Sequence, residues 1–347
     1  MSSSGPLVSV IITIYNQLHY LDRALRSVLS QDYPNLEIIV GDDASIDGDV
    51  ALFLSVYDDE RITCIRQMTN LGRHTHYKTL LYEHAKGDWV TVLNADDFYT
   101  NPSYISKAMK LIMSNDSIVL VFGKTGIYVE DTQRIICDSA SEHLPDIIDG
   151  NQLLLNQTKG HIIPHITSLY HRSTALQLNF YQAKIWSEDW ESLLRIIQGK
   201  KVSHIPQLSG LYGRHHHNVS KTIDLDIAME NLEYILSPYR LAKKMGEIDS
   251  KVLDEWKENM IYRYIVKIYI KLSLWDQKNV RFFLKRIEEE IPTTSLRMKK
   301  DYKIKLFNII KNNDIFLKIA FKYYLRQEAL IADFLQHRKY GKGKYKA

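Results

Sequence analysis

Two short acidic clusters follow apolar runs in this sequence. Gly41-Asp42-Asp43 comes after the run 36–40, and Asn94-Ala95-Asp96-Asp97 comes after the run 89–93. In an open α/β sheet, ligands bind in the crevice outside the carboxyl ends of the strands. Carboxylates at such a place suit a sugar hydroxyl, the edge of a nucleotide base or a hard divalent cation. The two clusters therefore predict a polar ligand site.

Each cluster also has a purely structural explanation. Capping of the next helix or turn explains Asp42 or Asp43, taken singly, about as well as ligand binding does. Turn chemistry explains Asp96 and Asp97 less well. A metal ion or a diphosphate-bearing ligand accounts for two carboxylates held close together, so this pair favours the ligand interpretation.

Alternating strands and helices are expected to position these clusters. The β-branched run 8–15 predicts a buried strand, and apolar residues at helical spacing predict a helix from Leu18 to Val28. Further strands are expected over 36–40, 62–65 and 89–93, with a helix over 77–85. This alternation predicts an α/β fold with a mostly parallel sheet, Rossmann-like and covered by helices on both faces.

The second half of the chain changes in character. A helix over 104–113 and strands over 118–122 and 126–129 are followed by a loop-rich stretch and by a helix that starts near Asp189. Beyond residue 225 we expect successive helices, broken at Pro238, near Gly246 and around Pro292. The sequence thus predicts two domains, an α/β domain over 1–224 and a basic helical extension over 225–347.

Composition and charge narrow the class of protein. The chain has 347 residues, 45% of them apolar, and a net charge of +4. Basic and acidic residues number 22 and 30 in residues 1–250 but 23 and 11 in residues 251–347, so an acidic body precedes a basic tail. Cys64 and Cys137 are two isolated thiols, which suits a reduced cytoplasm.

No apolar stretch approaches the roughly 18 residues that span a bilayer, and the N-terminus lacks a basic region of the secretory kind. We therefore expect a cytoplasmic protein. The segments 265–274 and 304–325 interleave Lys with large apolar residues, which is compatible with binding at an anionic membrane surface on the inner face of the cell membrane. The commoner explanation of such segments is a helical bundle with a basic exterior or a homo-oligomer interface. No nucleic-acid-binding module is present, so a nucleic-acid partner is not expected.

Several strings in order resemble one family. VSVIITIYN, QDYPNLEIIVGDDAS, NLGR and AKGDWVTVLNADD are similar to the family 2 glycosyltransferases of GT-A fold, whose usual strings are close to VSVIIPTYN, VDDGSTD, NxG and LDADD. The likeness continues through IIPHITSLYHR over 162–172, SEDWE over 187–191 and YGRHHHNVS over 212–220. It covers about residues 7–220 and does not reach the helical tail.

The resemblance implies a role for each matching residue. Thr13, Tyr15 and Asp43 would contact the nucleoside of a nucleotide sugar. Asn94 and Asp96 would also belong to the donor-binding residues, with Asp96 contacting the donor ribose or the metal. Asp96, Asp97 and His215 would hold Mn²⁺ or Mg²⁺, although His216 and His217 leave the choice of histidine ring open. Lys78 lies about where the family has a basic residue near the donor, one residue late relative to Gly72.

The resemblance also implies a mechanism. Asp189 matches the general base, which would take the proton of an acceptor hydroxyl as that oxygen displaces the nucleoside diphosphate with inversion. The donor would be a UDP-sugar, and the acceptor a glycan or lipid-linked glycan of a bacterial surface polysaccharide. From the residues alone, an N-cap of the following helix explains Asp189 equally well.

Two departures from the family strings matter. Asn94 stands where the family has the first Asp of DxD, and Gly213 stands where it often has Arg. They keep open a non-catalytic sugar-nucleotide-binding or scaffold protein as an alternative. A sugar-phosphate nucleotidyltransferase fits less well, because Tyr15-Asn16-Gln17 replaces the glycine-rich phosphate loop expected after its first strand.

Overall fold

The computed structural model describes residues 5–137, 144–160, 162–215 and 224–311. The chain divides into two compact units, one comprising 1–219 with 233–254 and the other 220–232 with 255–347. The predicted boundary at 224/225 differs from this division at residues 220–224 and in the segment 233–254. That segment groups with the first unit because Ser237 donates to Glu191 and the ring of Tyr234 packs edge-on against Trp190.

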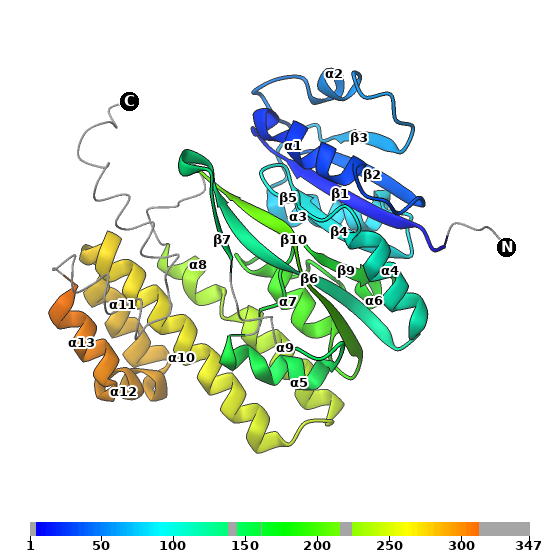
Figure 1. Ribbon diagram of the computed structural model, residues 1–347. Coiled ribbons are helices and arrows are strands. Elements are labelled where there is room, and N and C mark those ends of the chain that lie inside the picture. Colours follow the sequence, from blue (N-terminus) through cyan, green and yellow to red (C-terminus); the bar gives the residue numbers. More distant parts are fainter. Residues whose placement is uncertain (1–4, 138–143, 161, 216–223, 312–347) are drawn as a thin grey trace. The chain divides into compact units, whose positions relative to one another are not determined.

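The first unit is built on a ten-stranded mixed sheet in the order β3-β2-β1-β4-β9-β6-β10-β5, with β7 beside β6 and β8 beside β10 (Figure 1). The strands are β1 (Val8–Ile14), β2 (Leu36–Asp42), β3 (Ile62–Arg66), β4 (Trp89–Asn94), β5 (Phe98–Tyr99), β6 (Ile118–Val129), β7 (Arg134–Cys137), β8 (Ile147–Asp149), β9 (Ser168–His171) and β10 (Lys201–Arg214).

The prediction of a parallel sheet holds for the first four strands and for the β6–β10 pair. Strand β1 pairs in parallel with β2 and β4, and β2 pairs in parallel with β3. Beyond β4 the sheet is mixed, because β9 runs antiparallel to both β4 and β6. The expectation of a mostly parallel sheet is therefore corrected for the second half, where β9 runs antiparallel to both of its neighbours.

Helices cover this sheet. They are α1 (Leu18–Leu29), α2 (Val50–Leu54), α3 (Arg73–Thr79), the π-helical turn η1 (Leu80–His84), α4 (Tyr104–Ser114), the 3₁₀ turns η2 (Glu130–Thr132) and η3 (Gln157–Lys159), α5 (Gly150–Asn156), α6 (Arg172–Gln177), α7 (Glu188–Ile196) and α9 (Glu233–Met245). Three boundaries differ from expectation. Helix α3 begins four residues before the predicted start at 77, β6 is one strand instead of two, and Pro238 lies inside α9.

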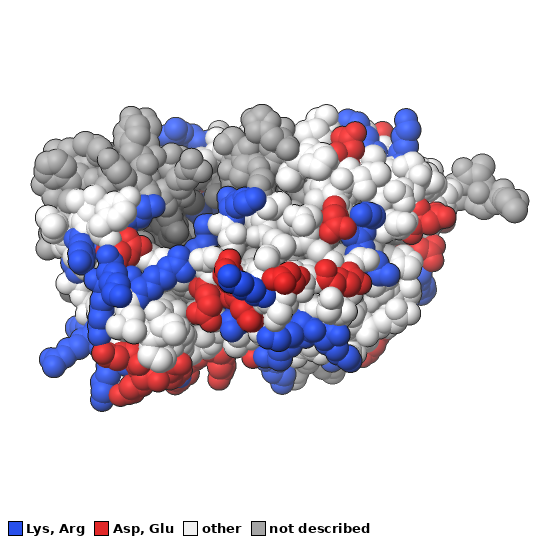
Figure 2. Space-filling model, turned by 90° about the horizontal axis from the view of Figure 1, so that it is seen from below, with Lys and Arg blue, Asp and Glu red and all other residues white. Residues whose placement is uncertain are grey.

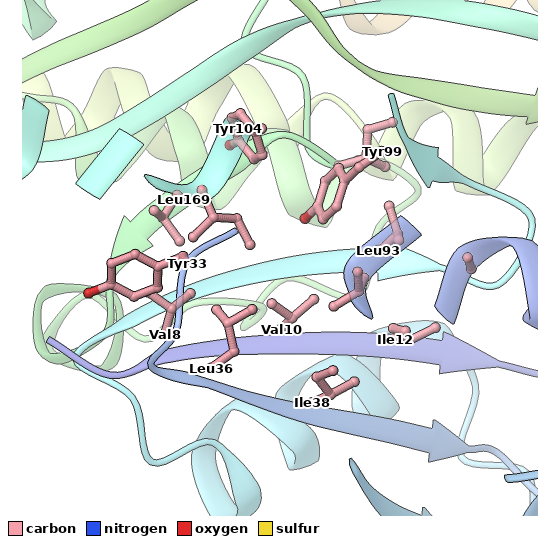
Figure 3. Close-up of a cluster of buried hydrophobic side chains, with 14 of the residues drawn as sticks. Val8, Val10, Ile12, Tyr33, Leu36, Ile38, Leu93, Tyr99, Tyr104 and Leu169 are labelled. Atoms are coloured by element: carbon pink, nitrogen blue, oxygen red, sulfur yellow. The ribbon is translucent and has the colours of Figure 1, made fainter. Parts of the chain in front are cut away.

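The hydrophobic core encloses the first strands of the sheet. Every residue of β1 is buried, as expected for a parallel strand covered on both faces. On one face, Val8, Val10 and Ile12 meet Leu36 and Ile38 of β2, with aromatic rings from the neighbouring segments closing the cluster (Figure 3). The carboxyl ends of β1, β2 and β4 therefore form a fixed platform.

The second unit is helical. It contains α8 (Leu225–Glu230), α11 (Gln277–Glu290), α12 (Pro292–Lys300), α13 (Tyr302–Ile310) and most of α10 (Ser250–Trp275), which begins in the first unit. The predicted breaks hold at Gly246, whose φ of 70° ends α9, and at Pro292, the first residue of α12. No described helix is long and apolar enough to cross a membrane. Figure 2 shows basic and acidic side chains interspersed over the face it presents. The tail segment 312–347 lies outside the described residues, as do His216 and His217.

Candidate active site

The first acidic cluster splits into two roles. Asp42 is fully buried, pairs with Arg66 and accepts a hydrogen bond from the backbone N–H of Ser45 at 2.8 Å. Asp43 instead accepts from the backbone N–H of Leu71 at 2.8 Å and of Gly72 at 3.0 Å. Asp42 is thus a structural residue that fixes the turn after β2, while Asp43 holds the loop before α3.

A buried histidine from α3 lies over the same turn. The Nε2 atom of His76 is 3.0 Å from the carbonyl oxygen of Gly41, and its Nδ1 atom is 3.8 Å from Oδ1 of Asp43. A Cβ atom on Gly41 would come within 2.8 Å of that Nε2 atom and 2.3 Å of a Leu80 methyl. Residue 41 must therefore be glycine for α3 to approach the end of β2.

Asn94, at the end of β4, uses both ends of its amide within the protein. Its oxygen accepts from the hydroxyl of Thr13 at 3.1 Å and from the hydroxyl of Tyr77, and its nitrogen donates to Asp97 at 2.8 Å. The Tyr77 ring is buried, which raises the pKa of its phenol. Asn94 therefore connects β1, α3 and the Asp96–Asp97 turn.

The second acidic cluster also divides. Asp97 is buried and accepts from the backbone N–H of Gly213 at 2.9 Å as well as from Asn94. Burial raises its pKa well above the ordinary range, and the neighbouring Asp96 adds to this effect. Oδ2 of Asp96 lies 3.1 Å from Nε2 of His215, a residue 119 positions away. Asp96 and His215 are thus brought together as predicted, whereas both oxygens of Asp97 are engaged inside the protein.

Gly213 is explained by this arrangement. A Cβ atom there would lie 2.0 Å from the backbone oxygen of Asp96. Any side chain at 213 would push the end of β10 away from the acidic turn. An arginine at this position, as in the family strings, does not fit the present backbone.

Aromatic and charged side chains from α1 surround the Asp96–His215 pair. The ring of Tyr20 stacks on His215 with centroids 4.8 Å apart. Arg23 donates to the backbone oxygen of Asp96 at 3.2 Å and pairs with Glu130. These contacts hold the two metal-ligand candidates in place from one side.

Asp189 lies in the first turn of α7, whose N-cap residue is Ser187. The N-cap explanation therefore does not apply to Asp189 itself. Its side chain is 26% exposed, and its Oδ2 atom lies 4.0 Å from Nδ1 of the buried His165. Burial lowers the pKa of His165, and the Asp189 carboxylate partly opposes that shift. A partly exposed carboxylate beside an imidazole is able to accept a proton.

The preceding residue, Glu188, is buried and receives two hydrogen bonds from Arg73, at 2.7 and 2.8 Å. Burial raises its pKa to about 7, although Arg73 opposes the shift. Arg73, His76 and Tyr77 were not among the predicted site residues, because no apolar repeat marks residues 73–76 and Tyr77 was expected only as the start of a helix. The helical continuation of the NLGR string was the signal that would have found them.

Two predicted donor-binding residues, Tyr15 and Lys78, lie in surroundings different from those of the acidic clusters. The Tyr15 side chain is 47% exposed, which leaves it accessible to a ligand. The Lys78 ammonium lies 5.6 Å from the centroid of the Tyr82 ring. Its neighbour Tyr77, rather than Lys78, contacts the end of β4. The structure does not bring Lys78 together with Asp43, Asn94 or Asp96 in any described hydrogen bond or ion pair.

The described residues contain no group of three or more His, Cys, Asp and Glu side chains that could hold a metal ion. The Asp96–His215 pair offers one carboxylate and one imidazole. Mg²⁺ is commonly held by one or two carboxylates together with phosphate oxygens and waters. The pair therefore fits a cation that arrives with, or is completed by, a diphosphate.

Comparison with known proteins decides the family. Residues 9–177 match the family model described as glycosyl transferase family 2. The chain carries a family 2 glycosyltransferase domain and is a glycosyltransferase. An uncharacterized glycosyltransferase of Haemophilus influenzae is 26% identical over 333 residues, which is 91% of this chain and 97% of that protein. A putative glycosyltransferase of Bacillus subtilis, EpsE, is 39% identical over 97 residues, or 27% of this chain and 34% of that protein.

Solved structures share the fold of this glycosyltransferase. TarS of S. aureus, solved with UDP-GlcNAc, superposes with a TM-score of 0.59 at 14% identity, covering 80% of this chain and 81% of that one. A mannosyltransferase of Pyrobaculum calidifontis, solved with GDP-Man and Mn²⁺, gives 0.55 at 15% identity, covering 98% and 89%. The predicted GT-A-type fold with C-terminal helices is confirmed.

Proposed function

We propose that this glycosyltransferase moves a sugar from a UDP-sugar to an acceptor hydroxyl with inversion, with help from Mn²⁺ or Mg²⁺. The observation that carries the proposal is the 3.1 Å approach of Asp96 to His215 at the carboxyl end of the sheet. This pair suits a cation shared with a diphosphate. Asp43, beside the same edge, would shape the nucleoside end of the site by holding the backbone N–H groups of Leu71 and Gly72.

The roles of the chain follow from these positions. Asp96 and His215 would hold the cation, which when bound stabilises the negative charge of the departing diphosphate. The turn that carries Asp96 would be positioned by Thr13, Asn94 and Asp97, which would not contact the metal. Their polar side-chain atoms form hydrogen bonds with one another or with the backbone N–H of Gly213. Tyr15, exposed after β1, would contact the nucleoside. Among the described residues, Lys78 makes no contact that supports a role at the donor.

Asp189 would act as the general base. The acceptor oxygen forms a bond to the anomeric carbon while the bond from that carbon to the diphosphate oxygen breaks. The acceptor proton passes to the Asp189 carboxylate. Because attack and departure occur on opposite faces in one displacement, the anomeric configuration inverts.

A donor panel tests the proposal. Wild-type protein is mixed with UDP-glucose, UDP-galactose, UDP-GlcNAc or GDP-mannose, with and without Mn²⁺, and both thermal stabilisation and release of nucleoside diphosphate are measured. We expect metal-dependent stabilisation and release with at least one UDP-sugar. Preference for GDP-mannose would overturn the assignment of uracil as the nucleotide base of the donor. The absence of a response to any donor would overturn the enzymatic proposal.

Asp189→Asn separates an enzyme from a donor-binding scaffold. We expect that this variant retains donor binding in Mn²⁺ and loses donor turnover. Persistent binding with no turnover in wild type would favour the scaffold alternative. Turnover at the wild-type rate in the variant would show that Asp189 is not the base.

The acceptor would be a glycan or lipid-linked glycan of a bacterial surface polysaccharide. The basic composition of the helical unit supports an anionic membrane surface as a meeting place, since residues 255–311 hold 14 basic and 7 acidic side chains. An oligomer interface on the same helices is the competing explanation.

A further inference from the structure

One short segment contacts all three parts of the proposed site. Leu71 and Gly72 donate to Asp43 at the end of β2. Five residues later, Tyr77 donates to Asn94 at the end of β4. Between them, Arg73 reaches Glu188, the residue before Asp189. The segment 71–77 thus joins the donor end of the sheet to the first turn of α7.

The contact between Arg73 and Glu188 has the geometry of a strong ion pair. Nε and Nη2 of Arg73 donate to the two carboxylate oxygens at 2.7 and 2.8 Å, and Nη2 also donates to the backbone oxygen of Trp186. Such two-point pairing fixes direction as well as distance. Glu188 is only 1% exposed, so its charge depends on this partner.

We propose that the Arg73–Glu188 pair positions Asp189 relative to the donor, so that the base is aligned through the segment that holds Asp43. The inference rests on the proposed function. Arg73 fixes both the residue before Asp189 and the chain at Trp186, and therefore sets the position of the first turn of α7. Arg73 is a positioning residue in this scheme, and Asp189 remains the group that takes the proton.

The first test needs no ligand. Hydrogen exchange of peptides covering 186–191 is compared in wild type, Arg73→Gln, Arg73→Lys and Glu188→Gln. We expect exchange about 10-fold faster or more in Arg73→Gln, and a smaller increase in Arg73→Lys, because Lys keeps the charge without the fork. Arg61→Gln is the matched control, since it removes another two-point pair, with Asp59 at 2.7 to 3.2 Å, beside β3.

The second test measures donor turnover in Mn²⁺ with the donor that wild type uses. A misplacement of about 1 Å costs on the order of 100-fold in rate. We therefore expect kcat to fall about 10- to 100-fold in Arg73→Gln while the KM for donor stays within about 2-fold. Glu188→Gln and the double variant should lose about the same factor, since both changes break one contact.

The outcomes are separable. Unchanged exchange over 186–191 in Arg73→Gln would overturn the inference whether or not the protein has activity. A raised donor KM with unchanged kcat would also overturn it, because Arg73 would then bind donor directly. If wild type turns over no donor, the proposed function fails, and the exchange experiment still decides whether the pair holds α7.

Discussion

The side-chain nitrogen of Asn94 donates to Oδ2 of Asp97 at 2.8 Å, while the Asn94 oxygen accepts from Thr13 and Tyr77. Residue 94 thus needs one side-chain atom that donates and one that accepts, which an amide provides and a carboxylate does not. The residue that departs from the family string is therefore built into the hydrogen-bond network of Thr13, Tyr77 and Asp97.

Asn94→Asp is expected to weaken the site, although it restores the family residue. A carboxylate at 94 would face the Asp97 carboxylate and lose the donated hydrogen bond, at a cost of about 1–3 kcal/mol in unfolding free energy. Mn²⁺-dependent donor binding should weaken with it. Chemical denaturation and a Mn²⁺ titration by thermal shift measure both quantities.

Asn115→Asp is the control for that change. Asn115 accepts a hydrogen bond from the Ser117 N–H through its oxygen, so an aspartate replaces it without loss. Tighter Mn²⁺ binding in Asn94→Asp would show instead that residue 94 reaches the metal.

Gly213→Ala should disrupt the site. The new methyl would lie 2.0 Å from the Asp96 backbone oxygen, which cannot move without shifting the acidic turn. We expect a loss of about 3 kcal/mol or more in stability together with loss of donor turnover. Gly160→Ala, at a φ of 93° with open space around it, reports the cost of backbone strain alone. Equal effects of the two substitutions would argue against the packing explanation.

His215→Gln should reduce the enhancement of donor binding by Mn²⁺ about 10- to 100-fold. The imidazole faces Asp96 and stacks on Tyr20, so its loss removes a ligand and a support. Isothermal titration of UDP with and without Mn²⁺ measures this factor. His84→Gln, at the end of η1, serves as the control. An unchanged Mn²⁺ dependence in His215→Gln would move the metal role to another residue.

Glu188 predicts a pH dependence of stability. Its pKa is about 7 in the folded protein, above the ordinary value of 4.5, so the fold favours the protonated form. Its stabilising contribution is complete below about pH 4.5 and is lost as the pH rises through about 7, on the order of 3 kcal/mol in all. The unfolding free energy should therefore fall by more between pH 5 and pH 8 in wild type than in Glu188→Gln. Parallel pH profiles of the two proteins would contradict this assignment.

The basic helical unit predicts binding to anionic vesicles. Full-length protein should float with phosphatidylglycerol vesicles, not with phosphatidylcholine vesicles, and about 0.5 M NaCl should release it because the attraction between exposed charges is screened. Equal behaviour with both lipids would favour a solution role for these helices, such as self-association.

The strings around Asp43, Asp96, Asp189 and His215 were sufficient to predict the family and the sheet edge, and they supplied these four residues as candidates for the site. The predictions follow from local patterns: β-branched runs define buried strands, and polar residues after them mark the strand ends. The start of α3 was not predictable in this way, because residues 73–76 carry no apolar repeat.

The amino-acid sequence alone thus determined which carboxylates gather at the end of the sheet. Only the tertiary structure decided how they divide, with Asp42 and Asp97 engaged by the protein's own N–H groups and Arg66, and Asp96 directed toward His215. That division depends on contacts between residues up to 119 positions apart. Such contacts arise when strands and helices pack, and no local spacing encodes them.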